Sequence, residues 1–335
     1  MKRKVSAGIG VLAIAGLVAG CSSPAEPESA GSGAWSFTDD RGVAVRADEQ
    51  PKRIIGQVSS AAALQDFGVP ITGTFGPLTS GDGSKERQAG SIDPAKVTDV
   101  TGNSYGELNM ERVATTRPDI LVSGKYAGFG GLWHLNEQQE RKVTEIAPTA
   151  GIQQDGKPLP EVIGRYQELA GALGADVASP KVQGDKHAFE AASKRIADLG
   201  AKLREQNRSI LTVGGTREQY YVVSPKRNPD LAYYVEQLGL PITEPANPDM
   251  AGGGYFEHLS WEKASAYQGD ILLWDTREAS LPPEQMKQNP TFASLPAAKA
   301  DRFVPWDALA PYSYASYAET MNRLADQIEA KAATF

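Results

Sequence analysis

Cysteine is almost absent from this chain of 335 residues, in which Cys21 is the single example. One cysteine cannot form an intramolecular disulfide or a thiolate-rich zinc site, so neither device can stabilise the fold. Positive charge is also in the minority, since the formal net charge is −7 at pH 7. A general nucleic-acid binder usually carries a basic face or stripe, so this balance argues against nucleic acid as a partner.

Common catalytic and nucleotide-binding patterns are missing as well. The chain has no G-x-S-x-G motif, and its loop glycines at 128–131 and 252–254 match neither a P-loop nor a dinucleotide fingerprint. Its three histidines, at positions 134, 187 and 258, fall short of a typical transition-metal set, because the second lies on a predicted helix. We therefore predict a binding protein rather than an enzyme. A direct metal-ion receptor and a secreted hydrolase stay open as less favoured alternatives.

The first stretch, 1–20, resembles the signal peptide of a bacterial lipoprotein. Three basic residues precede an apolar run, 5–19, that is too short to span a bilayer as a stable helix. Small residues then lead to Cys21, as in a lipobox. This resemblance implies that Cys21 becomes the lipidated N-terminus on the outer face of the cell membrane, where several acyl chains give stable anchoring. Residues 21–34 have the composition of a disordered tether.

One phrase occurs twice in the rest of the chain. Residues 108–121 read LNMERVATTRPDIL, and residues 259–272 read LSWEKASAYQGDIL. Both copies contain a leucine, a glutamate three positions later, and an Asp-Ile-Leu at the same distance from that glutamate. Strand-like and helix-like patterns alternate around each copy. Such alternation predicts, in each half, a mostly parallel sheet covered by helices.

Between the two halves lies a stretch with the composition of a long helix. Strong helix formers dominate 181–205, where apolar residues recur at heptad-like spacing. Pro180 suits the first turn of such a helix. We therefore expect two similar α/β lobes, 35–178 and 207–335, joined by one connecting helix at 179–206. A single stiff connection predicts a small closing motion rather than a wide hinge.

Several short phrases are similar to the substrate-binding lipoproteins of iron-siderophore and vitamin B12 ABC importers. They are Arg41-Gly42 with 51–55, the N-M-E and R-P-D-I-L-V segments within 109–122, and the segments 145–149 and 295–302. Together the similarity covers about 37–329. It implies a fold of two α/β lobes joined by one long helix, with the ligand in the cleft between them.

That resemblance also implies a function. The chain would be a monomeric, lipid-anchored receptor that binds a ferric siderophore and delivers it to an ABC permease and its ATPase subunits. Iron would arrive inside the ligand, so no cofactor and no protein ligands to a metal are expected. A haem or cobalamin receptor of the same fold is the alternative. By motif position, Glu111 and Glu262 correspond to the two glutamates that pair with arginines of the permease in this family.

The carboxyl ends of parallel strands are where open α/β sheets bind ligands, which points to loops rich in aromatic residues. A ferric chelate has broad apolar faces and often a negative centre, which suits aromatic rings and a few arginines. Segment 214–221 is expected to be one of these loops. The candidate ligand-binding residues are Tyr105, Tyr126, Trp133, Arg217, Tyr220, Trp274, Arg277, Trp306 and Tyr312. For each, the alternative is packing in the core or a solvated surface charge.

Overall fold

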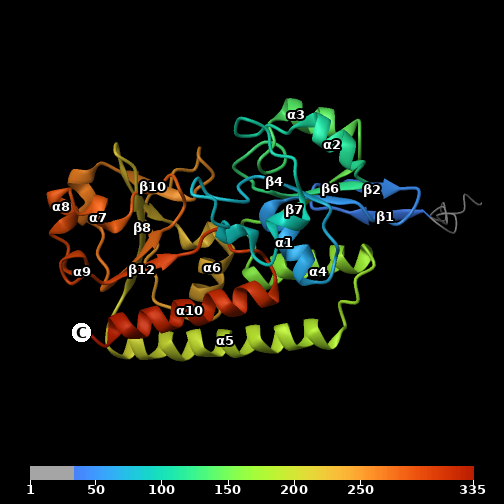
Figure 1. Ribbon diagram of the computed structural model, residues 1–335. Helices are drawn as coiled ribbons and strands as arrows, with labels where there is room; N and C mark the ends of the chain where they lie inside the picture. The colour runs from blue at the N-terminus through green and yellow to red at the C-terminus, as the bar shows by residue number, and fades with distance from the viewer. Residues whose placement is uncertain (1–33) are drawn as a thin grey trace, which may run out of the picture. The chain divides into compact units, whose positions relative to one another are not determined.

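The computed structural model describes residues 34–335. The predicted signal peptide, the lipidation site Cys21 and nearly all of the predicted tether therefore lie outside the described residues. Two α/β units are connected by a long helix, as Figure 1 shows. In this described part, no helix has both the length and the apolar character needed to cross a membrane.

The first lobe, for which we keep the limits 35–178, contains a five-stranded sheet in the order β5-β4-β3-β6-β7. All its neighbouring strands pair in parallel. The strands are β3 (Ile54–Gln57), β4 (Gly73–Phe75), β5 (Thr98–Asp99), β6 (Ile120–Lys125) and β7 (Thr149–Gln153), preceded by a hairpin of β1 (Trp35–Thr38) and β2 (Ala44–Ala47). The helices are α1 (Val58–Asp66), α2 (Met110–Thr116), α3 (Glu137–Thr144) and α4 (Leu159–Ala172), with short 3₁₀ helices η1 (Arg87–Ala89) and η2 (Pro94–Lys96).

The second lobe, 207–335, has a five-stranded sheet in the order β10-β9-β8-β11-β12. Its strands are β8 (Ile210–Gly215), β9 (Tyr220–Val223), β10 (Phe256–Leu259), β11 (Ile271–Asp275) and β12 (Phe303–Trp306). Its helices are η3 (Pro225–Arg227), α6 (Pro229–Glu236), η4 (Trp261–Ala266), α7 (Pro283–Met286), α8 (Pro290–Ala293), α9 (Pro296–Lys299) and α10 (Tyr314–Ala332). Strands β8, β11 and β12 are parallel, whereas β9 and β10 are antiparallel to their neighbours.

The antiparallel hairpin β8–β9 is the main departure from the predicted fold. Segment 214–221 was expected to be a loop, but β9 begins at Tyr220, which pairs with Gly215. A tight turn makes this possible, because the Thr216 hydroxyl accepts hydrogen bonds from the backbone of Glu218 and Gln219 at 3.2 and 3.3 Å. The two α/β lobes and the long connecting helix are confirmed, and the second sheet is more mixed than predicted.

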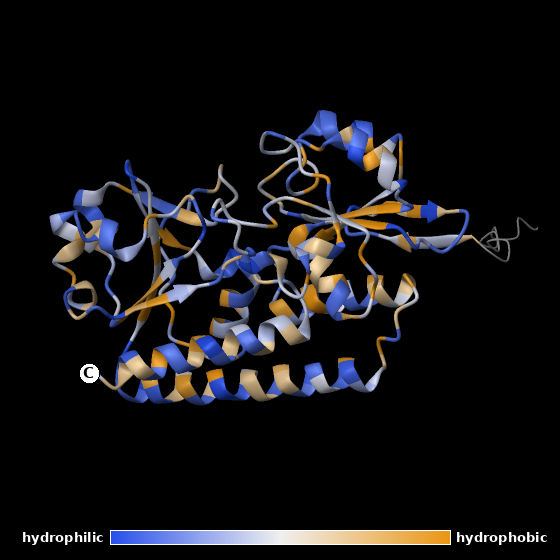
Figure 2. Cartoon of the chain, viewed as in Figure 1, coloured by the Kyte–Doolittle hydropathy of each residue, from blue (hydrophilic) through white to orange (hydrophobic). Residues whose placement is uncertain are grey.

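The connecting helix α5 (Pro180–Glu205) begins after Ser179, whose hydroxyl accepts a hydrogen bond from Val182 N at 3.4 Å. Its apolar stripe is buried as predicted, and α10 lies along it in Figure 1. One continuous hydrophobic core includes residues of both helices and of both lobes. Figure 2 shows apolar residues concentrated in the strands and banded along α5 and α10. The lobes therefore share a packed base.

The repeated phrase forms the same unit twice, a helix followed by a strand: α2 then β6, and η4 then β11. Its aspartate has one role in both copies. Asp119 accepts a hydrogen bond from the backbone N–H of Arg53 at 2.8 Å, and Asp270 accepts one from Ser209 at 2.9 Å. An arginine side chain, Arg53 or Arg208, pairs with each carboxylate. The repeated aspartate thus ties two neighbouring strands together at their first residues.

Candidate ligand-binding site between the lobes

The segment that follows β6, residues 126–133, carries aromatic side chains in mutual contact, and we call it the aromatic segment. The ring centroids of Tyr126 and Trp133 are 4.7 Å apart, and those of Phe129 and Trp133 are 5.2 Å apart. Tyr105 adjoins this group at 6.4 Å from Trp133 and 4.9 Å from His134. Tyr105 is 70% exposed and Phe129 is 51% exposed, so this part of the surface offers aromatic faces to solvent.

Hydrogen bonds hold this aromatic segment on the end of the sheet. The backbone N–H of Trp133 donates to the carbonyl of Gly124 at 2.7 Å, and the Ser123 hydroxyl donates to the Trp133 carbonyl at 2.7 Å. The backbone N–H of Ala127 donates to the Asp155 carboxylate at 3.0 Å. Because the backbone is fixed at both ends, the rings are arranged in advance of any ligand.

The second lobe presents a smaller aromatic group. Tyr221 of β9 and Phe256 of β10 have ring centroids 4.9 Å apart, and Tyr255 lies 6.2 Å from Phe256. The Tyr221 hydroxyl donates a hydrogen bond to Asp275 at 2.8 Å. This hydrogen bond links the antiparallel half of the sheet to β11, so the hairpin missed by sequence reasoning also supports the site.

The aromatic groups of the two lobes touch. Tyr255 lies 6.3 Å from Tyr126 and 6.4 Å from Phe129, measured between ring centroids. The Tyr255 hydroxyl donates to Asp155 of the first lobe at 2.6 Å. Burial raises the pKa of both Tyr126 and Tyr255, so both hydroxyls stay protonated near neutral pH. The aromatic cluster, as we call it, consists of Tyr105, Tyr126, Phe129, Trp133, His134, Tyr221, Tyr255, Phe256 and His258.

Arg277 borders the aromatic cluster from the second lobe. Its guanidinium lies 5.1 Å from the ring centroid of Phe256 and 5.8 Å from that of Trp306. Its Nε donates to both oxygens of Asp275, at 2.9 and 3.0 Å, and the Asp275 side chain is fully buried. Burial acts to lower the pKa of Arg277, but the carboxylate outweighs it and raises the pKa. Arg277 is therefore a permanent cation whose charge is already paired.

Two predicted site residues face the other side of the second sheet. Tyr220 is fully buried and Trp274 is half-buried, and both pack in the core beneath η4 and α8. Successive side chains of a strand point to opposite faces, so their neighbours Tyr221 and Asp275 lie on the side of the aromatic cluster instead. On both strands, the side chain that faces the aromatic cluster is one residue away from the predicted site residue. Tyr220 and Trp274 are therefore not part of the aromatic cluster.

Three further candidates lie around the aromatic cluster rather than in it. Arg217 is exposed in the β8–β9 turn, whose Thr216 carbonyl accepts a hydrogen bond from Trp261 of η4 at 3.1 Å. Trp306 is 2% exposed and supports Arg277 from the core. Tyr312 is buried at the junction of the lobes, where its ring stacks on that of Tyr166 at 6.2 Å. Tyr105, Tyr126, Trp133 and Arg277 are the candidates that the structure brings together.

Sequence reasoning missed two buried carboxylates, Asp155 and Asp275. Asp155 follows β7 and Asp275 ends β11, so the strand-end rule that selected the aromatic loops applies to both. The missing information was the exact strand boundary, which decides the face on which each side chain lies. Nothing in the sequence separated Phe129, Tyr255 and Phe256 from the aromatic residues of the core.

Two pockets are relevant to ligand binding, one in the first lobe and one lined by residues of both lobes. One of about 320 Å³ opens beside Tyr105 and His134, and burial lowers the pKa of His134 to about 4, which keeps its imidazole neutral. Another, of about 490 Å³, lies between residues 85–91 and the start of α10. Its arginines, Arg87 and Arg323, lie 3.7 and 3.1 Å from Asp307. The first pocket adjoins the aromatic cluster, whereas the second is lined by charges that pair with each other.

Comparison with known families decides what kind of protein this is. The family model described as periplasmic binding protein matches residues 57–310, which is more than half of the chain. The chain belongs to the periplasmic binding protein family. No curated protein matches the chain. The family model and the 35% identical structure describe a binding protein and a receptor, which agrees with a binding protein rather than an enzyme.

Solved structures similar to this periplasmic binding protein include receptors and binding proteins for siderophores. DesE, a ferric-siderophore receptor protein from Streptomyces coelicolor, is 35% identical with a TM-score of 0.80, over 88% of this chain and 98% of DesE. The siderophore periplasmic binding protein from the fuscachelin gene cluster of Thermobifida fusca is 21% identical, with a TM-score of 0.56 over 85% and 98% of the two chains. The iron uptake ABC transporter substrate-binding protein PiuA from Streptococcus pneumoniae is 16% identical, with a TM-score of 0.61 over 89% and 98%. The last two show the fold only.

The two glutamates of the repeated phrase are exposed in this periplasmic binding protein. Glu111 lies in the first turn of α2 and Glu262 in the first turn of η4. Hydrogen bonds from its own backbone N–H and from Ser260 lower the pKa of Glu262, which keeps that carboxylate ionised. A negative charge at the start of a helix is favoured by the helix dipole, so this position also has a purely local explanation.

Among residues 34–335, no three His, Cys, Asp or Glu side chains gather closely enough to hold a metal ion. His258 and Asp249 approach each other at 3.9 Å, while His187 lies on α5.

Proposed function

We propose that this protein is a receptor for a ferric siderophore, which it binds against the aromatic cluster and delivers to an ABC permease. The observation that carries the proposal is the chain of ring contacts that runs from Tyr105 in the first lobe to Phe256 in the second, beside Arg277. The 35% identity to a ferric-siderophore receptor supports it.

The chemistry of the aromatic cluster suits a chelate with broad apolar faces. Aromatic rings contribute large contact areas, and their flat faces fit the organic arms that wrap the iron. The neutral hydroxyl of Tyr126 can donate a hydrogen bond to an oxygen at the edge of the chelate, whereas the Tyr255 hydroxyl already donates to Asp155. A planar tetrapyrrole would also stack on such rings, so haem and cobalamin remain the alternative ligands to test. The iron would keep the coordination that its own ligand supplies.

The charges around the aromatic cluster favour a chelate of low net charge. A ferric tricatecholate is trianionic, whereas a ferric trihydroxamate is neutral. Arg277, the cation in contact with the cluster, is paired with Asp275, and Asp155 adds a second buried carboxylate. Asp155, Asp275 and Arg277 together carry one net negative charge, so a trianion placed beside them would be repelled. We therefore favour the ferric trihydroxamate.

Delivery would depend on the exposed glutamates and on the membrane anchor. The proposed contacts are Glu111 on the first lobe and Glu262 on the second, each paired with an arginine of the permease. Exposed charge pairs of this kind act mainly on association rate and orientation. The proposed lipid at Cys21 would keep a monomeric receptor on the extracytoplasmic side of the cell membrane. The shared core at the base of the lobes supports a small closing motion.

Equilibrium titration with four ligands tests this proposal. The mature protein is titrated with a ferric trihydroxamate, a ferric tricatecholate, haem and cobalamin, with quenching of tryptophan fluorescence and calorimetry as readouts. We expect saturable binding of the ferric trihydroxamate at submicromolar concentration and at least tenfold weaker binding of the tricatecholate. Failure of both ferric chelates to bind would refute the proposed function, and preferential binding of haem or cobalamin would replace it.

A further inference from the structure

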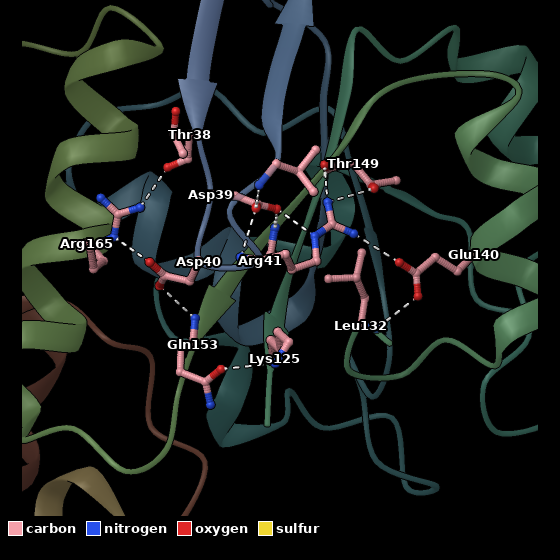
Figure 3. Close-up of polar contacts among 12 residues, drawn as sticks. Thr38, Asp39, Asp40, Arg41, Lys125, Leu132, Glu140, Thr149, Gln153 and Arg165 are labelled. Atoms are coloured by element: carbon pink, nitrogen blue, oxygen red, sulfur yellow. Dashed lines mark hydrogen bonds and ion pairs between the residues drawn. The ribbon is translucent and has the colours of Figure 1, made fainter. Parts of the chain in front are cut away.

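The turn of the β1–β2 hairpin is fixed on β7 by a buried carboxylate (Figure 3). Asp39, whose side chain is fully buried, accepts hydrogen bonds from the backbone N–H of Gly151 at 2.8 Å and from Arg41 Nε at 2.6 Å. Arg41 Nη2 also donates to the Thr149 hydroxyl at 3.1 Å. With a further hydrogen bond from Nη2 to the Thr149 carbonyl at 2.5 Å, three contacts fix the Arg41 guanidinium in one orientation.

From this turn, Arg41 reaches the aromatic segment through one glutamate. Its Nη1 donates to Glu140 Oε1 of α3 at 3.0 Å, and Glu140 Oε2 accepts a hydrogen bond from the backbone N–H of Leu132 at 3.1 Å. Leu132 directly precedes Trp133. The Arg41 and Glu140 side chains are 18% and 20% exposed, so water screens their charges less than it would at the surface. Charge-assisted hydrogen bonds are stronger than neutral ones, so this connection is a firm one.

The backbone beside Leu132 is shaped for this contact. Gly131 has φ +80°, and a Cβ added there would lie 2.5 Å from Glu140 Oε2, so a side chain would displace the carboxylate. Leu132 itself is 2% exposed and packs in the core of the first lobe. The segment can therefore move little while Glu140 keeps its place, and the place of Glu140 is set by Arg41.

We propose that Arg41 and Glu140 are positioning residues for ligand binding, which hold the backbone at Leu132 so that Trp133 faces the ligand. This inference rests on the proposed function of the aromatic cluster. Arg41 lies outside the part of the chain that the family model matches, residues 57–310. The hairpin is thus a support of the binding surface as well as a cover for the edge of the sheet.

The same hairpin turn provides a matched control. Asp40 accepts hydrogen bonds from Arg165 Nε and from the backbone N–H of Gln153, both at 2.9 Å. The other partners of Arg165, which lies on α4, are the Thr38 carbonyl at 2.9 Å, Glu168 and the Phe37 ring at 5.0 Å. None of them belongs to the aromatic segment, as Figure 3 shows for Thr38. The substitutions Arg41→Gln and Arg165→Gln each remove one arginine that pairs with an aspartate of the turn, but only the first releases Glu140.

The first readout is the exposure of Trp133 without ligand. Emission of Trp133 is isolated as the difference between each protein and the same protein carrying Trp133→Phe, and acrylamide quenching is measured. We expect quenching of Trp133 to rise about twofold or more in Arg41→Gln and in Glu140→Gln, and to stay at the wild-type value in Arg165→Gln. Equal quenching in all four proteins, or an equal rise in Arg165→Gln, would overturn the inference.

The second readout is affinity for a ferric trihydroxamate in a double-mutant cycle. We expect Arg41→Gln and Glu140→Gln to weaken binding about tenfold, and to have little further effect when Trp133 is already Phe. A tenfold loss in the Trp133→Phe background would show that the effect does not pass through Trp133 and would overturn the inference. If the wild-type protein binds no ferric chelate, the proposed function fails, while the quenching result still decides the positioning role.

Discussion

The two lobes are built from the same helix-then-strand unit, yet they present different chemistry to each other. At the start of the strands the two copies agree, because Asp119 and Asp270 each tie the start of one strand to the start of its neighbour. At the ligand side, they differ. The segment after β6 carries aromatic rings held by backbone hydrogen bonds, whereas β11 ends in Asp275 with Arg277 just beyond.

This difference separates what the fold requires from what the ligand requires. The aspartate is retained in both copies because each sheet needs its strands aligned. Beyond the strands, one lobe supplies flat apolar surface and the other supplies a paired charge supported from the core by Trp306 and Asp230. A chelate between the lobes would thus meet two unlike faces, and the predictions below test this asymmetry.

The largest expected effect concerns Asp230, another buried carboxylate of the second lobe. Asp230 accepts a hydrogen bond from Trp306 Nε1 at 2.8 Å, and burial raises its pKa from 3.8 to about 6. A raised folded pKa means that the stability from this group is fully present below pH 3.8 and is lost as pH rises through about 6. Relative to the wild type, Asp230→Asn should gain about 3 kcal/mol in free energy of unfolding between pH 4 and pH 8. Urea unfolding at both values measures it, and an equal difference at both would contradict the assignment.

The next effect compares two tryptophans that sequence reasoning treated alike. Trp133 lies in the aromatic cluster, while Trp274 packs in the core of the second lobe. Trp133→Ala should weaken binding of the ferric trihydroxamate by about 2 kcal/mol, as loss of an aromatic anchor does. Trp274→Phe should lower thermal stability slightly and leave affinity unchanged. Calorimetric titration of both variants checks this, and a larger loss of affinity in Trp274→Phe would move the site to the other face of the sheet.

A smaller effect concerns the aspartate that the two copies of the repeated phrase share, Asp119 in the first lobe and Asp270 in the second. Asp119→Ala and Asp270→Ala should each lower the free energy of unfolding by about 1–2 kcal/mol. The first leaves the backbone N–H groups of Lys52 and Arg53 without their acceptor, and the second leaves that of Ser209. The two losses should be similar, and affinity for ligand should not change. Urea denaturation of the two variants gives the answer. Losses that differ by more than about 2 kcal/mol would mean that the aspartate does not have one role in both lobes.

The smallest effect on the isolated protein is expected at the two exposed glutamates. Replacing Glu111 and Glu262 by Arg should leave ligand affinity and thermal stability unchanged, since both side chains are exposed. Uptake of the chelate by cells should fall severalfold, because the proposed pairs with permease arginines become repulsive. Replacing Glu137, an exposed glutamate in the first turn of α3, in the same way is the control. Loss of ligand affinity would place the two glutamates in the binding site instead.

The sequence was informative where a pattern extends over many residues. The apolar stripe of α5, the repeated helix-then-strand unit and the aromatic segment after β6 were all visible, because periodicity and composition determine them. The sequence did not show on which face of the sheet each side chain of a short strand lies, because a shift of one residue exchanges Tyr220 with Tyr221 and Trp274 with Asp275. The hairpin β8–β9 was missed because its turn depends on the single hydroxyl of Thr216.

The position of the iron atom tests the central claim most directly. Crystals of the protein with a ferric trihydroxamate would locate the metal by its anomalous scattering. The iron is expected between the lobes, within one chelate arm of Tyr126, Tyr255 and Arg277. An iron peak on the opposite face of the second sheet, beside Tyr220 and Trp274, would contradict the account. So would a peak in the charged pocket between residues 85–91 and α10.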